Sequence, residues 1–289
     1  MELRGTVTAL VTPFRNGEVD TDSLGRLVEY QLSSGVSGLL ACGCTGEPAT
    51  MTEDEKKRVI DTVLEAAGGR VPVMAGTGTN CTASTVEYTR KVSRTPVDGV
   101  LVITPYYNKP TPEGQIAHYT AVADASEKPV TVYNVPGRTG TSMTIETLAR
   151  LGEHPNIIGV KDAAGSVERV TALRGMSSMA YMSGDDHLAL PQILMGASGV
   201  ISVTSNAAPG MMSRMVELGL NGNVSQAREI HEKLYPLFGA LFLETNPSPV
   251  KKALEMMGII ADGSPRLPLV PPGEKTVTVL ERVIRKAGL

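Results

Sequence analysis

The sequence has little that could cross-link it or hold a metal ion. It contains three cysteines, four histidines and no tryptophan among 289 residues. Three cysteines are too few, and odd in number, for a disulfide framework, so we expect a reducing, cytoplasmic location. The histidines stand singly, and Cys42 and Cys44 are spaced more closely than zinc-binding cysteines usually are. We therefore predict no metal site and no resident cofactor.

The sequence also lacks an excess of charge and a long apolar run. Its 27 basic and 30 acidic side chains leave a net charge of −3 and are mixed along the chain. This composition excludes a protein that coats nucleic acid. No apolar run approaches the roughly 18 residues that suggest a membrane span, and the first residues lack the apolar core of a signal peptide. We expect neither nucleic acid nor membrane as a partner.

Eight short runs rich in β-branched residues alternate with amphipathic segments of helix length. The runs lie at 5–11, 38–41, 71–75, 99–103, 129–134, 157–161, 179–182 and 199–203. Continuous apolar stretches such as residues 100–103 are typical of strands buried on both faces of a parallel sheet. Eight such units in about 220 residues predict an α/β fold, an eight-stranded parallel β/α (TIM) barrel.

The strand pattern stops near residue 205, and helical patterns follow. They lie at 208–220, 224–240, 248–258 and 274–287. No linker rich in glycine or serine separates the last three from the rest. We therefore predict a catalytic barrel domain over 1–222 and a C-terminal helical region over 223–289 that packs on the barrel.

Several helix ends carry capping signals. Thr52 and Glu55 have the spacing of a capping box, in which side chain and backbone satisfy each other's hydrogen bonds. Thr111 and Ser248 each precede a proline, a pattern typical of an N-cap followed by the first helical residue. Gly258 is expected to end the helix that Ser248 begins.

Polar and glycine-rich segments follow the predicted strands at their carboxyl ends. They are GCTGE (43–47), TPYYN (104–108), YNVPGRTG (133–140), GVKD (159–162), SGDD (183–186) and GVISV (199–203). Because β/α barrels build their active sites at this end of the strands, we expect these segments to share one rim.

Lys161 is the most informative residue on this rim. It ends an apolar run, and a desolvated ammonium has a lowered pKa, which favours the neutral amine that attacks carbonyl groups. The alternative is a strand-end lysine that simply extends to water. Tyr133, one strand away, could carry the protons that imine formation requires, or could be a packed tyrosine with a satisfied hydroxyl.

Other rim segments have two interpretations each. The loop 43–47 could bind a carboxylate through its backbone N–H groups, or be an ordinary strand-to-helix turn. Arg138 could grip a second carboxylate with two parallel hydrogen bonds, or be an exposed loop residue. Asp185, Asp186 and His187 together resemble a metal cluster, but an aspartate before a helix is more often a cap, which we favour.

Together with NPSPVK at 246–251, these motifs resemble the dihydrodipicolinate synthase family of pyruvate-dependent class I aldolases. The resemblance covers essentially the whole chain. The lysine and the tyrosine are shared across the superfamily, whereas GRTG at 137–140 and NPSPVK are more specific to the synthases. The resemblance implies a step of lysine (diaminopimelate) biosynthesis, in which pyruvate and L-aspartate 4-semialdehyde condense to 4-hydroxy-tetrahydrodipicolinate.

The resemblance also implies roles for individual residues. Lys161 would form the Schiff base with pyruvate, and Tyr133 would transfer protons. The backbone N–H groups of Cys44 and Thr45, with the Thr45 hydroxyl, would bind the pyruvate carboxylate. Arg138 would bind the carboxylate of the semialdehyde.

Further roles concern the pocket wall and the assembly. Gly184 and the Ile201 carbonyl would line the pocket. By the family's pattern, Tyr107 reaches the site of a neighbouring subunit. This implies a tight dimer, usually doubled to a homotetramer.

One departure from the family pattern lies in the proton relay. Most synthases carry two threonines where this chain has Cys44 and Thr45, and the first hydroxyl bridges the residues equivalent to Tyr133 and Tyr107. A thiol is a weaker donor and acceptor than a hydroxyl. We expect the chemistry to continue at a reduced rate, with carboxylate binding unaffected.

A second departure concerns feedback inhibition by lysine. Asn80 and Tyr106 match the effector pocket of sensitive members, but Ser84 stands where sensitive bacterial forms have a glutamate. Glu53 and Lys56 replace two histidines. We predict weak or absent inhibition by L-lysine.

Two alternatives stay open. N-acetylneuraminate lyases and the aldolases or dehydratases of 2-keto-3-deoxy sugar acids would use Lys161 and Tyr133 identically. Arg138 favours the synthase, because a sugar substrate offers hydroxyls where the semialdehyde offers a carboxylate. A ligand-sensing barrel without catalysis is the other alternative, with Cys44 as its first sign.

Overall fold

Eight strands close into a barrel in the computed structural model, which describes all residues from 1 to 289. Hydrogen bonds link them in the order β1-β10-β9-β8-β7-β6-β5-β4, and each pairing described among them is parallel. The strands span Gly5–Ala9 (β1), Gly38–Ala41 (β4), Val73–Gly76 (β5), Gly99–Ile103 (β6), Val130–Asn134 (β7), Ile157–Asp162 (β8), Ala180–Ser183 (β9) and Gly199–Ser202 (β10). The barrel predicted from the sequence is confirmed.

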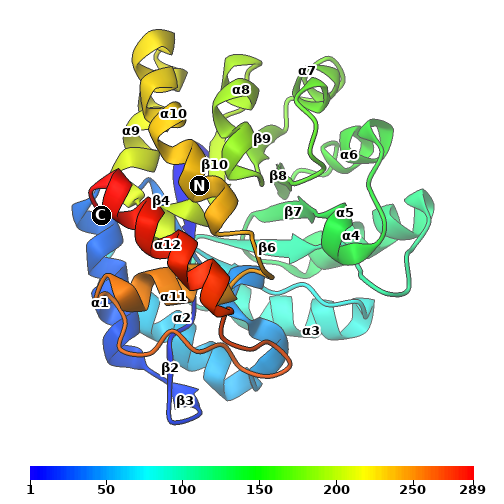
Figure 1. Ribbon diagram of the computed structural model, residues 1–289. Coiled ribbons are helices and arrows are strands. Elements are labelled where there is room, and N and C mark those ends of the chain that lie inside the picture. The colour runs from blue at the N-terminus through cyan, green and yellow to red at the C-terminus, as the bar shows by residue number, and fades with distance from the viewer. The chain divides into compact units, whose positions relative to one another are not determined.

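The chain divides into two compact units, the first of which comprises Met1–Gly5 and Met74–Ile201. Its helices are α3 (Thr82–Ser93), α4 (Pro112–Ala125), α5 (Pro136–Thr139), α6 (Ile145–Leu151), α7 (Glu168–Arg174) and α8 (Ala189–Leu194). Helices α3, α4, α6 and α7 pack successively on one another, in the order of the strands they connect (Figure 1). Every residue of β7 is buried, as expected for a parallel strand covered on both faces.

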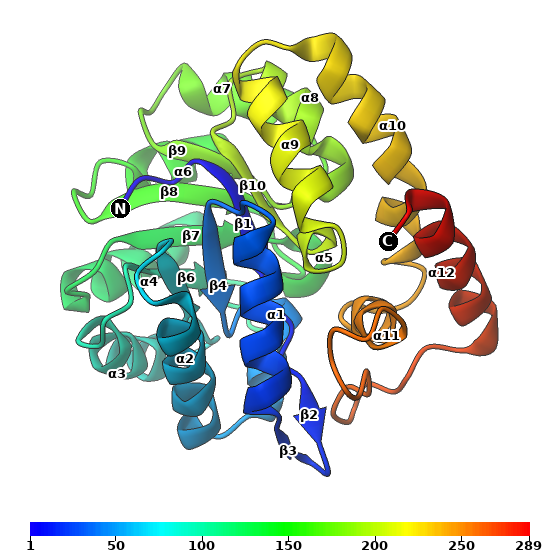
Figure 2. The same cartoon turned by 90° about the vertical axis from the view of Figure 1, so that its left-hand side faces the viewer.

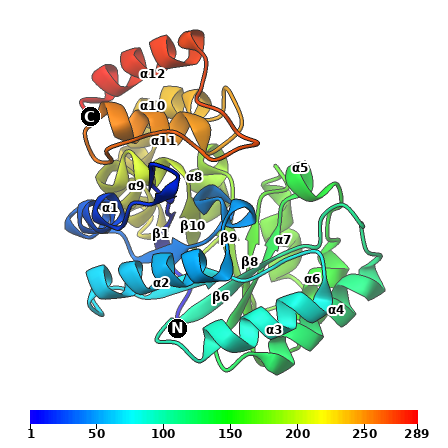
Figure 3. The ribbon, with the colours of Figure 1, turned by 90° about the horizontal axis from the view of Figure 1, so that it is seen from below.

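The second unit comprises Thr6–Val73 and Ser202–Leu289. Besides β1 and β4 it contains the hairpin β2 (Phe14–Arg15) and β3 (Glu18–Val19), and helices α1 (Thr21–Ser33), α2 (Glu53–Ala67), α9 (Pro209–Leu220), α10 (Val224–Ala240), α11 (Ser248–Met256) and α12 (Glu274–Ala287). Helices α1 and α2 pack side by side (Figure 2). Helix α12 packs on α10 and α11 (Figure 3). The predicted boundary at residue 222 stays a prediction.

Most elements begin and end within about two residues of their predicted bounds. The hairpin of β2 and β3 was not expected. Its turn is Asn16-Gly17, with φ of 53° and 82°, and this dipeptide suits the two-residue turn of a hairpin. The strands are only two residues long, too short to give a detectable alternation of apolar and polar positions.

The capping predictions have mixed outcomes. Thr52 forms the expected capping box, and the Thr111 hydroxyl accepts from the third residue of α4. Gly258 follows α11 with φ of 72°, a left-handed conformation that favours glycine. The prediction that Ser248 caps α11 is wrong. Pro247 occupies the cap position, so the helix begins one residue earlier and Ser248 is its first residue.

No helix combines the length and the apolar character that crossing a bilayer would need.

Candidate active site

Lys161 and Tyr133 lie together at the carboxyl ends of β8 and β7. They are partners in the parallel register, so their side chains share one face of the sheet. The Lys161 Nζ lies 4.4 Å from the centroid of the Tyr133 ring. Lys161 is 4% exposed and Tyr133 is 6% exposed. The lysine therefore does not extend into bulk water, as the alternative interpretation would require.

The backbone behind Tyr133 is fixed by buried hydrogen bonds. Both the backbone N–H and the hydroxyl of Thr104 donate to the Tyr133 carbonyl, at 2.9 and 2.8 Å. The Tyr119 hydroxyl, fully buried, donates to the Val102 carbonyl at 3.0 Å. The two Thr104 bonds tie the end of β6 to the end of β7, and the Tyr119 bond ties α4 to β6, so the backbone of Tyr133 is fixed beside β8.

Asp162 follows Lys161 but does not serve as its counterion. Successive strand residues point to opposite faces, so the carboxylate lies on the other side of the sheet. There Arg169 Nε donates to its Oδ2 at 2.8 Å, and Asn134 Nδ2 donates to its Oδ1 at 2.9 Å. The Asp162 side chain is fully buried. Its charge is compensated behind the rim, where the network braces β7 against β8.

The next two strands continue the rim. The Gly184 N–H donates to the Asp162 carbonyl at 2.8 Å. A Cβ on Gly184 would stand 2.7 Å from the Cβ of Ala163, so only glycine lets the ends of β8 and β9 approach this closely. Ile201 is fully buried in β10, which pairs with β9.

The prediction that the Asp185 side chain caps a helix is wrong. Asp185 does stand at the N-cap position of the short 3₁₀ helix Asp186–Leu188, but its carboxylate makes no capping bond. Instead its Oδ2 accepts from the Gly165 N–H at 3.2 Å. Burial raises the pKa of this carboxyl. The donor to the Asp185 carboxylate therefore comes from the loop after β8 and not from the helix.

Arg138 lies in the one-turn helix α5 directly after β7 and is exposed. The preceding loop packs against the same turn, because a Cβ on Gly140 would lie 2.8 Å from Lys109 Cε. In this loop Tyr107 is 89% exposed, and both Tyr107 and Lys109 have positive φ, at 73° and 45°. The turn that presents the Arg138 guanidinium therefore has a second cation packed on it.

The residues of the predicted effector pocket come from two adjoining segments. The Asn108 side chain donates to the Asn80 carbonyl at 2.7 Å, which joins the loop of Tyr106 to the start of α3. Tyr106 is half-buried, and Ser84 is exposed in the first turn of α3.

Cys44 and Thr45 belong to the second unit, in the 3₁₀ turn Cys44–Gly46 that follows β4. The Gly46 N–H donates to the Gly43 carbonyl at 2.8 Å and closes the turn. Thr45 is 3% exposed, and Cys44 is half-buried. Burial raises the pKa of the Cys42 thiol to about 12, so Cys42 is a core residue rather than a reactive one.

The NPSPVK segment fastens this turn. Asn246 Nδ2 donates to the Thr45 hydroxyl oxygen at 3.0 Å. Lys251 Nζ donates to Glu47 Oε1 at 2.8 Å, and the two side chains are 0% and 2% exposed. The other Glu47 oxygen accepts from the Arg266 N–H at 2.9 Å. A buried ion pair and two further hydrogen bonds thus hold the loop in one conformation.

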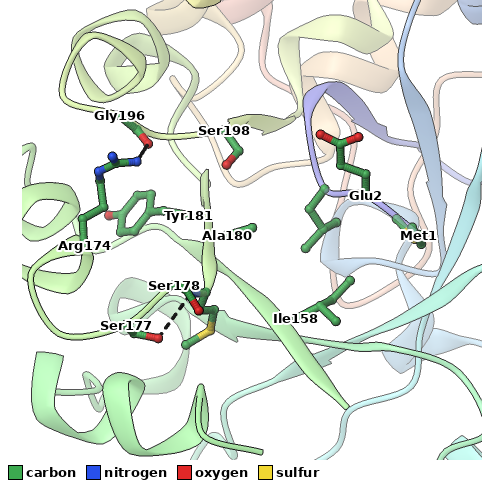
Figure 4. A pocket seen from close by; sticks show the side chains of 12 residues that line it. Met1, Glu2, Ile158, Arg174, Ser177, Ser178, Ala180, Tyr181, Gly196 and Ser198 are labelled. Atoms are coloured by element: carbon green, nitrogen blue, oxygen red, sulfur yellow. Dashed lines mark hydrogen bonds between the residues drawn. The ribbon is translucent and has the colours of Figure 1, made fainter. Parts of the chain in front are cut away.

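A separate pocket of about 440 Å³ opens at the amino ends of β8 and β9 (Figure 4). Ile158 and Ala180 line it, with the first residues of the chain and Arg174, which donates to the Gly196 carbonyl at 3.0 Å. None of the predicted site residues lines this pocket. It lies at the opposite end of the strand from Lys161.

Three residues near the site were missed as contributors. Asn246 and Lys251 belong to a motif distinctive enough to single out, but their partners lie 201 and 204 residues away in the sequence. No local pattern reveals such a pairing. Lys109 follows the tyrosine pair and carries no signal of its own.

The chain matches known proteins over nearly its whole length. The profile described as the Dihydrodipicolinate synthetase family matches residues 2–287. A 4-hydroxy-tetrahydrodipicolinate synthase of Pelobacter propionicus is 44% identical over 288 residues, covering 99% of both chains. The solved structure of a chloride-inhibited dihydrodipicolinate synthase from Acinetobacter baumannii, complexed with pyruvate, is similar with a TM-score of 0.96 at 43% identity, covering 99% of both chains. A structure described as the first monomeric dihydrodipicolinate synthase variant gives a TM-score of 0.97 at 43% identity, covering 99% of this chain and 97% of that one.

Proposed function

The chain belongs to the dihydrodipicolinate synthetase family, and on that premise we propose that it is a lyase that condenses pyruvate with L-aspartate 4-semialdehyde. The product is 4-hydroxy-tetrahydrodipicolinate, with release of water, in lysine biosynthesis. The observation that carries the proposal is the buried pair of Lys161 and Tyr133, with the amine nitrogen 4.4 Å from the phenol ring.

Lys161 supplies the nucleophile. Its Nζ attacks the C2 carbonyl of pyruvate, and loss of water from the resulting carbinolamine gives an imine. The protonated imine withdraws electrons, so a methyl proton leaves and an enamine forms. The enamine carbon attacks the aldehyde of the second substrate. The amine of that substrate then displaces Lys161 and closes the ring, which frees the enzyme.

Tyr133 transfers protons during these steps. Carbinolamine formation and dehydration each need a proton moved to or from oxygen, and a positioned phenol can do both. The hydrogen bonds from Thr104 to the Tyr133 carbonyl support this role, because they restrict where the phenol can lie. Tyr107 and Cys44 complete the relay in our proposal.

The remaining predicted residues bind the two substrates. Thr45 and the backbone of Cys44 bind the pyruvate carboxylate, and Arg138 binds the carboxylate of the semialdehyde with two parallel hydrogen bonds. Gly184 and Ile201 line the pocket. The position of Lys109 on the Arg138 turn supports carboxylate binding there, since it adds positive charge.

The test has two parts. Borohydride reduction in the presence of pyruvate should attach one three-carbon adduct at Lys161, identified by mass spectrometry, and no adduct should form in Lys161→Ala. Turnover of aspartate semialdehyde should then exceed that of N-acetylneuraminate and of 2-keto-3-deoxy sugar acids. A missing adduct would favour the ligand-sensing barrel without catalysis. Preferred turnover of a sugar acid would favour a sugar-acid aldolase or lyase.

We also propose a homotetramer built from two tight dimers. The 89% exposure of Tyr107 supports this, because a second copy would cover a large aromatic side chain that is otherwise in water. Leu194 and Met195, at the end of α8, are 40% and 48% exposed and offer a second apolar contact.

We also propose a cytoplasmic location and weak or absent inhibition by L-lysine. The three cysteines are free thiols, which supports a reducing, cytoplasmic compartment. Ser84 offers a neutral hydroxyl where a lysine effector's ammonium would need a carboxylate, which supports weak or absent inhibition by L-lysine. An inhibition constant in the micromolar range would contradict it.

A further inference from the structure

We propose that Asn246 is a positioning residue that fixes the Thr45 hydroxyl as a hydrogen-bond donor toward the substrate carboxylate. The inference rests on the proposed role of Thr45 in binding pyruvate. Its basis is the hydrogen bond of 3.0 Å from Asn246 Nδ2 to Thr45 Oγ1, formed between residues that are 4% and 3% exposed. Asn246 acts through Thr45 and does not itself need to touch the substrate.

The hydrogen-bonding capacity of the Thr45 hydroxyl determines where its proton can point. A threonine hydroxyl has one proton to give and two lone pairs that accept. Because Asn246 donates to Thr45, the threonine proton cannot point back at the amide and must be directed elsewhere. A carboxylate has acceptor oxygens only, so it needs that proton. Without Asn246 the hydroxyl rotates among its staggered positions and gives up part of this preference.

Neither partner can drift from the other, because both sides are anchored. On the loop, the Thr12 hydroxyl donates to the Gly46 carbonyl at 2.8 Å. On the α11 side, Lys251 forms its buried ion pair with Glu47 at 2.8 Å, and Lys251 Nζ also lies 4.4 Å from the Phe14 ring centroid. The Asn246 amide is therefore presented to Thr45 by two segments that are held to each other independently of this bond.

The orientation of the amide makes the proposal testable. If the amide were turned over, its oxygen would accept the Thr45 proton, and Thr45 would have nothing to give to the substrate. Asn246→Asp imposes that arrangement with almost the same shape, because an ionised carboxylate can only accept. Asn246→Ala removes the bond altogether.

The experiment measures borohydride trapping of the pyruvate imine as a function of pyruvate concentration, with kcat measured alongside. In Asn246→Ala the half-saturating pyruvate concentration should rise about tenfold, the loss expected for weakening a hydrogen bond to a charged group, with kcat at saturating pyruvate close to the parent value. In Asn246→Asp the rise should be larger. It should also grow as the pH increases through the titration of the new carboxyl, which a purely structural loss would not do.

A double-mutant cycle with Thr45→Val shows whether the effect passes through the hydroxyl. Thr45→Val should weaken pyruvate binding by itself, and adding Asn246→Ala should then change nothing further. Asn156→Ala is a matched control, since that asparagine donates to the Ala123 and Ser126 carbonyls at 3.0 and 2.9 Å, at the amino end of β8. It should leave pyruvate binding unchanged.

Three outcomes separate this inference from the proposed function. No adduct in the parent protein would remove the proposed function itself. An adduct whose pyruvate dependence is unchanged in Thr45→Val would remove the role of Thr45. A normal Thr45 effect with unchanged binding in both Asn246 variants, or with effects that multiply in the double variant, would overturn the role of Asn246 alone.

Discussion

At the scale of single residues, the proposed chemistry depends on where two common side chains are placed. A lysine side chain in water at neutral pH is almost entirely protonated, and a protonated amine is not a nucleophile. Between β7 and β8 the amine and the phenol are buried together, within one strand spacing, and the phenol's backbone is tied down by Thr104. In the proposed mechanism, placement rather than residue type is therefore what would make Lys161 and Tyr133 a reactive pair.

Removing the phenol oxygen alone should slow the reaction without weakening substrate binding. In Tyr133→Phe we expect kcat to fall by about 10²- to 10⁴-fold, the usual contribution of a proton-transfer group, with little change in the pyruvate KM. Steady-state kinetics checks this. Tyr30→Phe is the control, because its hydroxyl donates to the Ala207 carbonyl and belongs to the fold. Equal kcat in the two variants would contradict the role of Tyr133.

The thiol at position 44 should limit the rate. Because a hydroxyl donates and accepts more strongly than a thiol, Cys44→Thr should raise kcat several-fold and leave the pyruvate KM unchanged. Cys81→Ser, at an exposed cysteine, should have no effect. A strong fall of kcat in Cys44→Thr would show that the relay does not run through this position.

At the scale of elements, the sequence predicted the strands and helices well because each has its own periodicity. The same strand ends also placed Tyr133 and Lys161 on one rim, since neighbouring parallel strands end together. The bonds of Asn246 and Lys251 to the loop after β4 could not be predicted, because they join segments that are 201 and 204 residues apart. Tertiary packing, not local pattern, chooses such partners.

Removing both partners of the ion pair between α11 and the loop after β4 should destabilise the fold less than removing the lysine alone. Lys251→Met leaves the Glu47 carboxylate buried without its cation, which should lower the free energy of unfolding by about 3–5 kcal/mol. Adding Glu47→Gln removes the uncompensated charge and should recover part of that loss. Urea unfolding followed by circular dichroism measures both. Equal stability of the single and double variants would show that the buried charge is not what destabilises the single variant.

The contact of α2 with the segment after α11 should depend on pH. Hydrogen bonds from Arg266 lower the pKa of Glu55 from 4.5 to about 2. A carboxylate with a lowered folded-state pKa stabilises the fold above its unfolded pKa and loses that effect as the pH falls. Glu55→Gln should therefore lower the free energy of unfolding at pH 7, with the difference from the parent shrinking between about pH 4.5 and about pH 2.

Urea titrations at several pH values test this dependence on Glu55. Asp54→Asn, in the same first turn of α2, is the control for loss of an acidic residue near the helix start. A difference between Glu55→Gln and the parent that stays constant down to pH 2 would show that the Arg266 contact is not its source.

At the scale of the whole molecule, the exposed side chain of Tyr107 leads to a prediction of how active sites are completed. If Tyr107 serves the neighbouring subunit, a dimer that pairs a Lys161→Ala chain with a Tyr107→Ala chain has both defects in the same site, that of the Lys161→Ala chain. One site of each mixed dimer then holds an intact lysine and an intact tyrosine. In a two-fold symmetric pair with random mixing, this restores about a quarter of the parent's sites.

The measurement is the activity of the two variants after co-refolding or co-expression. We expect it to exceed the average of the two separate preparations. The control is a mixture of folded preparations assayed before subunits exchange, which should show only that average. Activity that stays at the average after exchange would show that Tyr107 serves its own chain.

The second unit is assembled from two segments that are far apart in the sequence, so the turn that carries Thr45 and the residues that anchor it are synthesised at different times. The turn that carries Thr45 leaves the ribosome well before its anchors, because Asn246 follows Thr45 by 201 residues and Lys251 follows Glu47 by 204 residues. Until Asn246 and Lys251 have been synthesised, the turn lacks the hydrogen bond and the ion pair that hold it in place. A message truncated before codon 246 yields a protein in which the turn that carries Thr45 never acquires these two anchors.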